Sequence, residues 1–461
     1  MDLGTYWQSL AVSQREYHFG RRSEDPLAHA FDGKHVVHAG LQGQVIPPPV
    51  AQAAWQQQMQ TAVTGHPSRL AYIHIPFCKT KCLYCGFFQN GTDQAEEDRY
   101  IGALVEELEE AGRAPCVTGA PFQAVFLGGG TPSSLSPDNA ALLLGTIRRC
   151  LPLANDYELT LEGRIRDVVP EKIETWLRGG VNRVSLGVQS FDTKVRRQVG
   201  RLDGEDEVLA RLDLLHSYNG CATVVDLMFG LPDQTPAVWQ HDLDTFARSG
   251  ADGCDLYQLN VFEESALAAA IRNGNLSPAA TTEEQGRLFL QGRETMQRYG
   301  FRRLSHCHWA KDNRERSLYN TLARSGCDLF PFGCGAGGHV GPLAGMLHRS
   351  LKGYGEMVRR GRKPFMVLSR QSPFAALEGR VQSQMEQCCF DLEGLIRLEP
   401  RLAGLRWLGS LWEGYGLWRN NGVRYQLTPA GEFWLVNMTQ TLLESLAILL
   451  DAPQAPAGRP V

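Results

Sequence analysis

Short apolar runs alternate with amphipathic stretches between residues 70 and 310. The runs have the length of strands and are often unbroken by polar residues, which is typical of strands buried in a parallel sheet. The intervening stretches repeat their apolar positions with a helical period. Strands are predicted at Ala71–Ile75, Ala124–Leu127, Glu158–Leu161, Arg183–Val188, Thr223–Met228 and Asp255–Asn260, with one more at Phe301–Trp309. Helices are predicted at Glu96–Ala111, Pro137–Cys150, Pro170–Arg178, Glu205–Tyr218, Pro236–Arg248 and Thr282–Tyr299. Successive strand–helix units predict an α/β fold whose parallel sheet curls toward a barrel.

The amino-terminal part of the chain lacks this alternation. Residues 1–66 have no steady period, and three consecutive prolines interrupt them at Pro47–Pro49. A Gln-rich stretch, Ala51–Thr64, predicts one helix. We expect this segment to form an arm wrapped on the main domain. Its three histidines, His29, His35 and His38, are more often solvent-facing or hydrogen-bonded than ligands.

The carboxy-terminal part predicts a small α+β domain. Leu417–Leu427 has the pattern of a hairpin with an Asn-Gly turn, and Thr428-Pro429 then provides an N-cap and a first-turn proline for a helix through Leu450. Helices, a hairpin and a final helix indicate a winged-helix-like module, which we expect to act as a lid or packing unit. The expected domains are an arm (1–66), the barrel (67–370), this module (371–450) and a disordered tail (451–461).

Composition narrows the class of protein. The 461 residues carry a net charge of −4, with a pI near 6.3, which argues against a nucleic-acid or membrane-surface partner. The most apolar late stretch, Phe433–Leu450, contains Asn437, Gln440 and Glu444 and is too short and polar to span a bilayer. Twelve cysteines spread over a long chain fit a reducing compartment. We therefore expect a soluble, cytoplasmic protein.

Three of these cysteines form the most informative motif in the chain. Cys78, Cys82 and Cys85 follow the first predicted strand with C-x3-C-x2-C spacing. Three thiolates on one short loop can hold an iron–sulfur cluster. Because a four-iron cluster has four corners, one iron would remain open to a ligand. The alternative, buried free cysteines, is less expected because Lys79 and Lys81 make the loop polar.

With Tyr84 before the last cysteine, and with the run Tyr72-Ile-His-Ile-Pro-Phe-Cys78, the chain resembles the radical S-adenosylmethionine (SAM) superfamily. Within it, the chain is similar to the branch that contains oxygen-independent coproporphyrinogen III oxidase, heme chaperones and anaerobic heme-degrading methyltransferases. The resemblance covers about residues 66–450. It implies an open, partial (β/α)6 barrel, a [4Fe-4S] cluster and reductive cleavage of SAM to a 5′-deoxyadenosyl radical, which the protein positions and insulates.

Polar residues at the ends of successive strands are candidates for binding SAM. A glycine turn, Gly128–Pro132, follows the second strand, and the resemblance implies that it holds the SAM amino group. Carboxylates and amides suit ribose hydroxyls and an ammonium group, and the resemblance implies that an arginine pairs with the SAM carboxylate. Each residue alone is more often a satisfied polar group, but their recurrence at strand ends favours a site. The expected set is Tyr72, Tyr84, Gly129, Gly130, Thr131, Glu162, Gln189, Arg201 and Asp226.

Two segments of this chain, one after Glu162 and one around Cys307, either depart from the motifs of the resembled branch or add to them. Glu162 is followed by Gly163-Arg164, where relatives usually carry an Asn-Pro or Asp-Pro step, so Arg164 is a candidate partner for a substrate carboxylate. His306 and His308 flank Cys307 and would share one face of a strand, where an imidazole could ligate heme iron. The alternative is that one histidine packs in the core and the other meets solvent. A later glycine-rich loop, Phe332–His339, is implied to line the SAM pocket.

The resemblance also suggests a reaction. The segments Cys85–Phe88, Glu162–Arg164 and Gly20–Leu27 look most like the heme-degrading branch, which implies radical methylation and ring opening of heme to a linear tetrapyrrole with iron release. A flavodoxin- or ferredoxin-type electron donor and a heme-trafficking protein are the expected partners. One alternative is the decarboxylating oxidase, whose family usually has a fourth cysteine where this chain has Phe87. The other is a non-enzymatic heme chaperone, whose relatives usually lack the amino-terminal arm.

Overall fold

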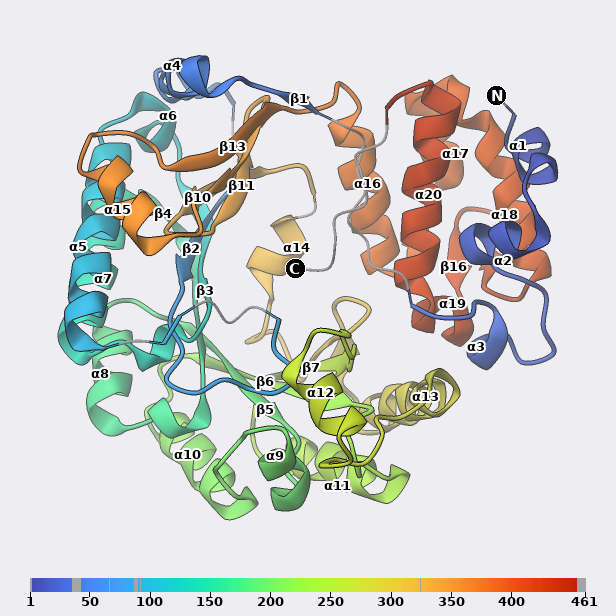
Figure 1. Ribbon diagram of the computed structural model, residues 1–461, viewed down its shortest axis with the longest axis horizontal. Helices are drawn as coiled ribbons and strands as arrows, with labels where there is room; N and C mark the ends of the chain where they lie inside the picture. The colour runs from blue at the N-terminus through green and yellow to red at the C-terminus, as the bar shows by residue number, and fades with distance from the viewer. Residues whose placement is uncertain are drawn as a thin grey trace.

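The computed structural model describes residues 2–34, 43–65, 67–86, 90–91, 93–323 and 325–453. One large sheet with strand order β1-β13-β12-β11-β10-β2-β3-β4-β5-β6-β7-β9-β8 forms the centre of the molecule. In Figure 1 the sheet is curved, and the carboxy-terminal helices lie at the right, across the sheet from α5 and α7. No helix in the described ranges combines the length and the apolar character that crossing a bilayer requires.

Six consecutive strands of this sheet are parallel, as the alternating sequence pattern predicts. They are β2 (Arg69–Ile75), β3 (Phe122–Gly129), β4 (Leu153–Gly163), β5 (Arg183–Gln189), β6 (Ala222–Phe229) and β7 (Gly253–Gln258). The helices around them are α5 (Gln94–Ala111), α7 (Pro137–Cys150), α8 (Pro170–Arg178), α9 (Thr193–Gln198), α10 (Glu205–Ser217), α11 (Pro236–Arg248) and α13 (Thr282–Arg298). The prediction of a partial (β/α)6 barrel is confirmed.

Local sequence explains why these helices begin where they do. Ser136 precedes Pro137 at the start of α7, and its side chain accepts a hydrogen bond from the backbone N–H of Asn139. Thr235 and Pro236 make the same arrangement at the start of α11. A capping oxygen accepts a hydrogen bond from an N–H that has no partner within the helix. Proline has no N–H, but at the first helical position no helical hydrogen bond is lost.

The sheet continues beyond the parallel strands on both sides. Next to β2 lie β10 (Asp328–Phe332), β11 (Gly337–Val340), β12 (Leu343–Leu347), β13 (Phe365–Arg370) and β1 (Gln44–Val45), of which only β10 runs parallel to its barrel neighbour. Next to β7 lie β9 (His308–Ala310) and β8 (Arg302–Arg303), both antiparallel. The prediction of a single strand at Phe301–Trp309 is therefore wrong. The chain reverses between two short strands, closed by the bond from the Leu304 N–H to the carbonyl of His308 at 2.8 Å.

The carboxy-terminal part of the chain forms helices and a separate three-stranded sheet. It contains α16 (Ala375–Glu386), α17 (Leu392–Leu398), α18 (Leu405–Gly414), α19 (Pro429–Phe433), α20 (Leu435–Leu450) and the strands β14 (Cys389–Phe390), β15 (Trp418–Asn420) and β16 (Tyr425–Leu427). The hairpin prediction is confirmed, with Gly422 in the left-handed region at φ +88°. Thr428 caps α19 as predicted, but the expected continuous helix is interrupted at Trp434. We refer to residues 371–450 as the carboxy-terminal domain.

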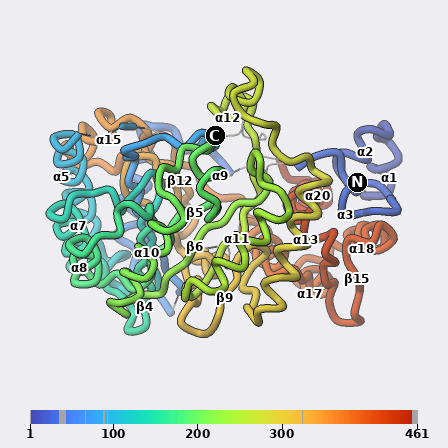
Figure 2. Tube along the Cα trace, turned by 90° about the horizontal axis from the view of Figure 1, so that it is seen from below, coloured from blue at the N-terminus to red at the C-terminus, as the bar shows by residue number. Residues whose placement is uncertain are grey.

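The amino-terminal arm divides between two neighbours. Helices α1 (Leu3–Ser9) and α2 (Val12–Phe19) lie beside α18 and α20 in both Figure 1 and Figure 2, and α3 (Pro26–His29) contacts α19 and α13. The indole N–H of Trp412 donates to the Phe19 carbonyl at 2.8 Å, and that of Trp434 to the Pro26 carbonyl at 2.9 Å. Helix α4 (Pro48–Met59) packs on the barrel side, against β13 and α6 (Pro115–Thr118), and β1 pairs with β13.

The expectation that the whole arm wraps the main domain is thus wrong for α1 and α2, which pack on the carboxy-terminal domain, whereas α3 contacts both α19 and the barrel helix α13. His29 ends α3 and is exposed. His35, His38, Phe87, Phe88 and residues 454–461 of the expected tail lie outside the described residues.

Candidate active site

The cysteine loop lies at the carboxyl end of β2, where barrel folds place their chemistry. Cys78 and Cys82 are buried, and Cys85 is half-buried. The Sγ of Cys78 lies 3.2 Å from the hydroxyl of Thr131 in the glycine turn after β3. The N–H of Gly130 donates to the Ile75 carbonyl at 2.7 Å. A Cβ at Gly130 would collide with the carbonyl oxygen of Phe77, so the glycine turn allows the loop to lie against it.

Arg164 fastens this loop from the end of β4. Its guanidinium donates to the Thr80 carbonyl at 2.8 Å and to the Thr80 hydroxyl, and one Nη lies 3.4 Å from the Sγ of Cys82. The expected role of Arg164 as a partner for a substrate carboxylate therefore needs correction. Its donors are directed at the cysteine loop, where a positive charge stabilises thiolate and sulfide.

The thiols fit a polynuclear cluster better than a single ion. Among the residues that the structure describes, no three His, Cys, Asp or Glu side chains converge as the ligands of one metal ion do. A four-iron cluster takes one thiolate per iron, so its three sulfurs surround a volume rather than a point. Hydrogen-bond donors next to two of the sulfurs, from Thr131 and Arg164, suit the charge of such a cluster.

On the side facing β5, several buried polar atoms lack partners. Gln189 ends β5 in a left-handed conformation at φ +72°, and its Oε1 has no hydrogen-bond partner among the described residues. Arg201 donates to the hydroxyl of Tyr84 at 2.8 Å, but its Nε is equally unsatisfied within the described ranges. A ligand with hydroxyl and carboxylate groups would satisfy both atoms. The amino-acid and ribose parts of SAM carry these groups.

Two carboxyl groups on the inner wall of the barrel form no direct ion pair within the described part of the chain, although the charge of Arg183 acts on both. Glu162 accepts a hydrogen bond from the N–H of Gly129 at 3.2 Å, and Asp226 accepts one from the Ser185 hydroxyl at 3.1 Å. Burial, followed by the charge of Asp226, raises the pKa of Glu162 to about 8. Burial, followed by the charge of Asp255, raises the pKa of Asp226 to about 6. An ammonium group bound here would favour the ionised forms of both.

Tyr72 occupies the same inner wall on β2. Its ring lies 6.3 Å from that of Phe126 on β3, in a stacked arrangement. Its hydroxyl is 3.1 Å from Nδ1 of His74. Desolvation raises the pKa of Tyr72, with Glu162 contributing next, so the phenol stays neutral.

The glycine-rich loop after β10 lies beside the end of β2. The Gly333 N–H donates to the buried carboxylate of Glu107 at 2.9 Å, and the Cys334 N–H donates to the Tyr100 hydroxyl at 3.0 Å. That hydroxyl in turn donates to the His74 carbonyl at 2.5 Å. These helix α5 side chains, which the sequence did not mark, therefore fix the loop against the strand that leads into the cysteines.

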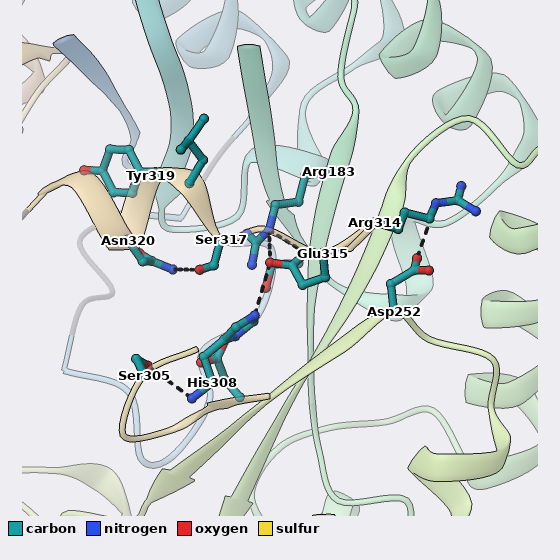
Figure 3. A network of polar contacts seen from close by, with 12 residues as sticks. Arg183, Asp252, Ser305, His308, Arg314, Glu315, Ser317, Tyr319 and Asn320 are labelled. Atoms are coloured by element: carbon teal, nitrogen blue, oxygen red, sulfur yellow. Dashed lines mark hydrogen bonds and ion pairs between the residues drawn. The ribbon is translucent and has the colours of Figure 1, made fainter. Parts of the chain in front are cut away.

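His308 belongs to a buried charged network (Figure 3). Its Nδ1 lies 2.9 Å from Asp255, and its Nε2 lies 3.1 Å from Glu315. The Nε of Arg183 lies 3.0 Å from the other oxygen of Glu315. Burial disfavours the charged imidazole, but the two carboxylates outweigh it and raise the pKa of His308 to about 9.

The expectation that His308 ligates heme iron is therefore corrected, since both ring nitrogens face carboxylates and the ring is protonated at neutral pH. Neither Glu315 nor Arg183 was among the site residues expected from the sequence. The only available signal was a charged residue at the start of an otherwise apolar strand, Arg183.

His306 does not share a strand face with His308, because it lies in the reversal between β8 and β9. Its Nδ1 is 2.7 Å from the carboxylate of Glu386 on α16. It lines a cavity of about 290 Å³ between the inner wall at β7, helix α14 (Leu318–Ala323) and α16. Tyr257 and Tyr319 supply aromatic surface to this cavity, and Tyr257 is 42% exposed. A cavity of this kind suits an organic substrate.

The fold and the cysteine loop define a class, and comparison with known proteins agrees. The model of the radical SAM superfamily matches residues 72–246, and the chain belongs to this superfamily. Its cofactors are accordingly a [4Fe-4S] cluster and SAM. Which residues contact the cluster and which contact SAM remains a prediction, and the geometry described above is consistent with it.

Particular relatives are more informative. The chain is 37% identical to the anaerobilin synthase of Escherichia coli O157:H7 over 407 residues, which cover 88% of this chain and 90% of the relative. It is 31% identical to the heme chaperone HemW of Bacillus subtilis, over 59% of this chain and 71% of the relative. Among solved structures, the coproporphyrinogen III oxidase HemN of Escherichia coli superposes with a TM-score of 0.73 at 21% identity, covering 87% of this chain and 96% of that one. This last similarity shows the fold alone.

Proposed function

We propose that this protein degrades heme without oxygen, by SAM-dependent radical methylation and ring opening that release iron and a linear tetrapyrrole. The observation that carries the proposal is the 37% identity to anaerobilin synthase, which extends over nearly the full length of both chains. The similarity to anaerobilin synthase therefore extends beyond the barrel to other parts of the chain. The relatives that are named as chaperones match a smaller share of the chain.

The residues of the inner wall have defined tasks in this proposal. When bound, the cluster supplies the electron that cleaves SAM. Cys78, Cys82 and Cys85 hold it, and Arg164 keeps their loop in place.

Other residues of the inner wall bind SAM. Glu162 and Asp226 accept hydrogen bonds from its ammonium and ribose groups, because neither carboxyl group forms a direct ion pair in the described structure. Gln189 orients the same molecule. Arg201, held by Tyr84, pairs with the SAM carboxylate.

The cavity beside β7 is the place for a flat tetrapyrrole. Tyr257 and Tyr319 present rings against which a porphyrin plane can stack. His306 lines the same cavity and is held by Glu386, so it is the remaining histidine candidate for contact with heme. The cavity adjoins Asp255, which neighbours Asp226 on the next strand, so substrate and SAM would meet at the inner wall.

Two partners complete the proposal. The reaction consumes electrons, so a low-potential carrier of the flavodoxin or ferredoxin type supplies them. Heme aggregates readily in water, so a heme-trafficking protein delivers it. The need for a low-potential electron carrier, together with the oxygen sensitivity of a cluster with an open iron, supports a cytoplasmic location.

The decisive experiment incubates anaerobically reconstituted protein with heme, SAM and a reductant, and analyses the pigment by mass spectrometry. We expect heme-dependent SAM consumption and a linear tetrapyrrole one methyl group heavier than simple ring opening gives. The Cys78→Ala protein is the matched control. Heme recovered unaltered after many equivalents of SAM would support a chaperone instead, and decarboxylation of coproporphyrinogen would support the oxidase.

A further inference from the structure

Cys307 places a thiol on the wall of the cavity beside β7. It lies in the reversal between β8 and β9 and is half-buried. Its Sγ is 3.4 Å from an oxygen of Asp255 and 3.8 Å from the hydroxyl of Ser305. Tyr257 and Tyr319 line the same cavity. The thiol therefore faces the space in which an aromatic substrate would lie.

Other cysteines outside the cluster loop have a different environment. Cys254 and Cys388 are fully buried, and desolvation raises the pKa of both thiols. Such thiols act as small apolar side chains that fill a core. Cys307 instead has a carboxylate neighbour, and cavity space lies beside it. Packing alone does not account for that combination.

The carboxylate that contacts Cys307 also contacts His308, which belongs to the charged network of Figure 3. Asp255 lies 2.9 Å from Nδ1 of His308, whose other nitrogen contacts Glu315, the partner of Arg183. The thiol thus stands between the substrate cavity and a buried, protonated imidazole.

Further carboxyl groups face this region from neighbouring elements. On the adjacent strand, Asp226 occupies the same level as Asp255, and Glu162 lies beyond it toward the glycine turn. From the carboxy-terminal domain, Glu386 faces the cavity with His306. Polar and ionisable groups therefore face the cavity from several elements.

We propose that Cys307 is a catalytic residue that donates a hydrogen atom to the substrate-centred radical in this cavity. This inference rests on the proposed function, because only a radical reaction on a bound substrate requires it. The substrate-centred radical cannot leave as a closed-shell tetrapyrrole until its unpaired electron is paired in a new bond. The S–H bond breaks homolytically, a C–H bond forms on the substrate, and a thiyl radical remains on Cys307.

The thiol is then restored in a balanced step. One electron from the low-potential carrier, which the proposed reaction already requires, reduces the thiyl radical to a thiolate. The thiolate takes a proton from the side of Asp255 and His308, and that pair regains its proton from solvent through the cavity. One electron and one proton are consumed for each hydrogen atom donated. In the resting thiol, the hydrogen bond from the S–H to Asp255 sets the position of the sulfur beside the cavity.

The test compares Cys307→Ala, Cys307→Ser and a control, Cys389→Ser, whose half-buried cysteine lies on β14 in the carboxy-terminal domain. Iron content, SAM affinity and the heme absorption spectrum are measured first, and all three variants should match the wild type. Reactions are then run in heavy water, and the ratio of tetrapyrrole to 5′-deoxyadenosine is measured together with deuterium in the product.

We expect the wild type and Cys389→Ser to place one solvent deuterium on a carbon of the product. Both Cys307 variants should still form 5′-deoxyadenosine but yield at least about tenfold less tetrapyrrole per 5′-deoxyadenosine. Serine keeps the polar contact with Asp255, but its O–H bond is too strong to donate a hydrogen atom. Rescue by serine, or an unchanged product ratio and deuterium content in Cys307→Ala, would overturn the proposal. A wild type that never converts heme would instead refute the proposed function.

Discussion

At the level of single residues, the cysteine loop depends on groups that lie far from it in the sequence. Arg164 bonds Thr80 and contacts Cys82, and Thr131 contacts Cys78. These donors come from the ends of β4 and β3, so the loop is shaped by the barrel as much as by its own residues. A change in one donor should therefore alter the cluster without unfolding the barrel.

The thiols themselves should be indispensable. Replacing Cys78, Cys82 or Cys85 with alanine removes one ligand of the cluster, so iron and sulfide content should fall from about four of each per chain to near zero, and SAM cleavage should be lost. Iron analysis and electron paramagnetic resonance measure this directly. Full iron content and activity in Cys78→Ala would refute the cluster assignment.

Arg164→Met should weaken the hold on the loop while keeping much of the length of the side chain. We expect reconstituted cluster to be lost to a chelator several-fold faster, because two hydrogen bonds to Thr80 and the charge next to Cys82 disappear. The matched control is Arg166→Met, two residues along and exposed. The prediction fails if the two variants lose iron at the same rate.

Because of Glu162, SAM affinity and the stability of the SAM-free protein should change with pH in opposite directions. Its pKa is raised from 4.5 to about 8 in the folded protein, so the SAM-free protein binds a proton that the unfolded chain releases. Glu162 therefore costs stability increasingly as pH rises from 4.5 to 8. SAM prefers the ionised form, so its affinity should rise with pH, by up to about tenfold per unit below that pKa.

Glu162→Gln should therefore raise the melting temperature of SAM-free protein at about pH 8 more than at about pH 5, and should flatten the pH dependence of SAM affinity. Calorimetric titration and thermal unfolding at several pH values measure both effects. A Glu162→Gln protein with the same pH profile as the wild type would show that another group controls binding.

At the level of elements, the features predicted best from the sequence are those that depend on residues close together in the chain. The barrel strands and their helices follow from apolar period and from caps such as Ser136, which act within one turn. The reversal at Leu304 was missed because each of its strands has two or three residues, too few to show a period. The roles of Arg164 and His308 were missed because their partners, Thr80 and Glu315, become neighbours only in the folded chain.

The contact between α13 and α19 gives a prediction at this scale. Glu432 on α19 is buried and receives Arg293 from α13 at 2.8 Å and Arg303 from β8 at 2.6 Å. Glu432→Ala leaves two arginines without their shared partner, which should cost about 3 kcal/mol of unfolding free energy. Denaturant unfolding measures the loss.

Glu393→Ala is the control. Both side chains of the Glu393–Arg406 ion pair are exposed, so this pair should contribute little to the unfolding free energy. Proteolysis between the barrel and the carboxy-terminal domain should accelerate in Glu432→Ala alone. Equal stability of the two variants would mean that the buried cluster does not hold the domains together.

At the scale of the whole molecule, the first three helices of the arm pack against the carboxy-terminal domain, and α3 also contacts the barrel helix α13. Deleting residues 1–34 uncovers Trp412, Trp434 and the apolar face of α20. We expect the melting temperature to fall by more than about 5 °C and the carboxy-terminal helices to become protease-sensitive. A peptide of residues 1–34 supplied separately should restore protection, and a truncated protein as resistant as the wild type would contradict the prediction.

The bond between Trp412 and Phe19 spans 393 positions of the chain, which has a consequence for biosynthesis. A ribosome that adds about 5–20 residues per second needs roughly 20–80 s to travel that distance. Helices α1 to α3 leave the ribosome well before their binding surface on α18, α19 and α20 is translated. The barrel can close and receive its cluster during this interval. The earlier-made segment therefore folds after the barrel, and it must stay out of aggregates until its binding surface has been made.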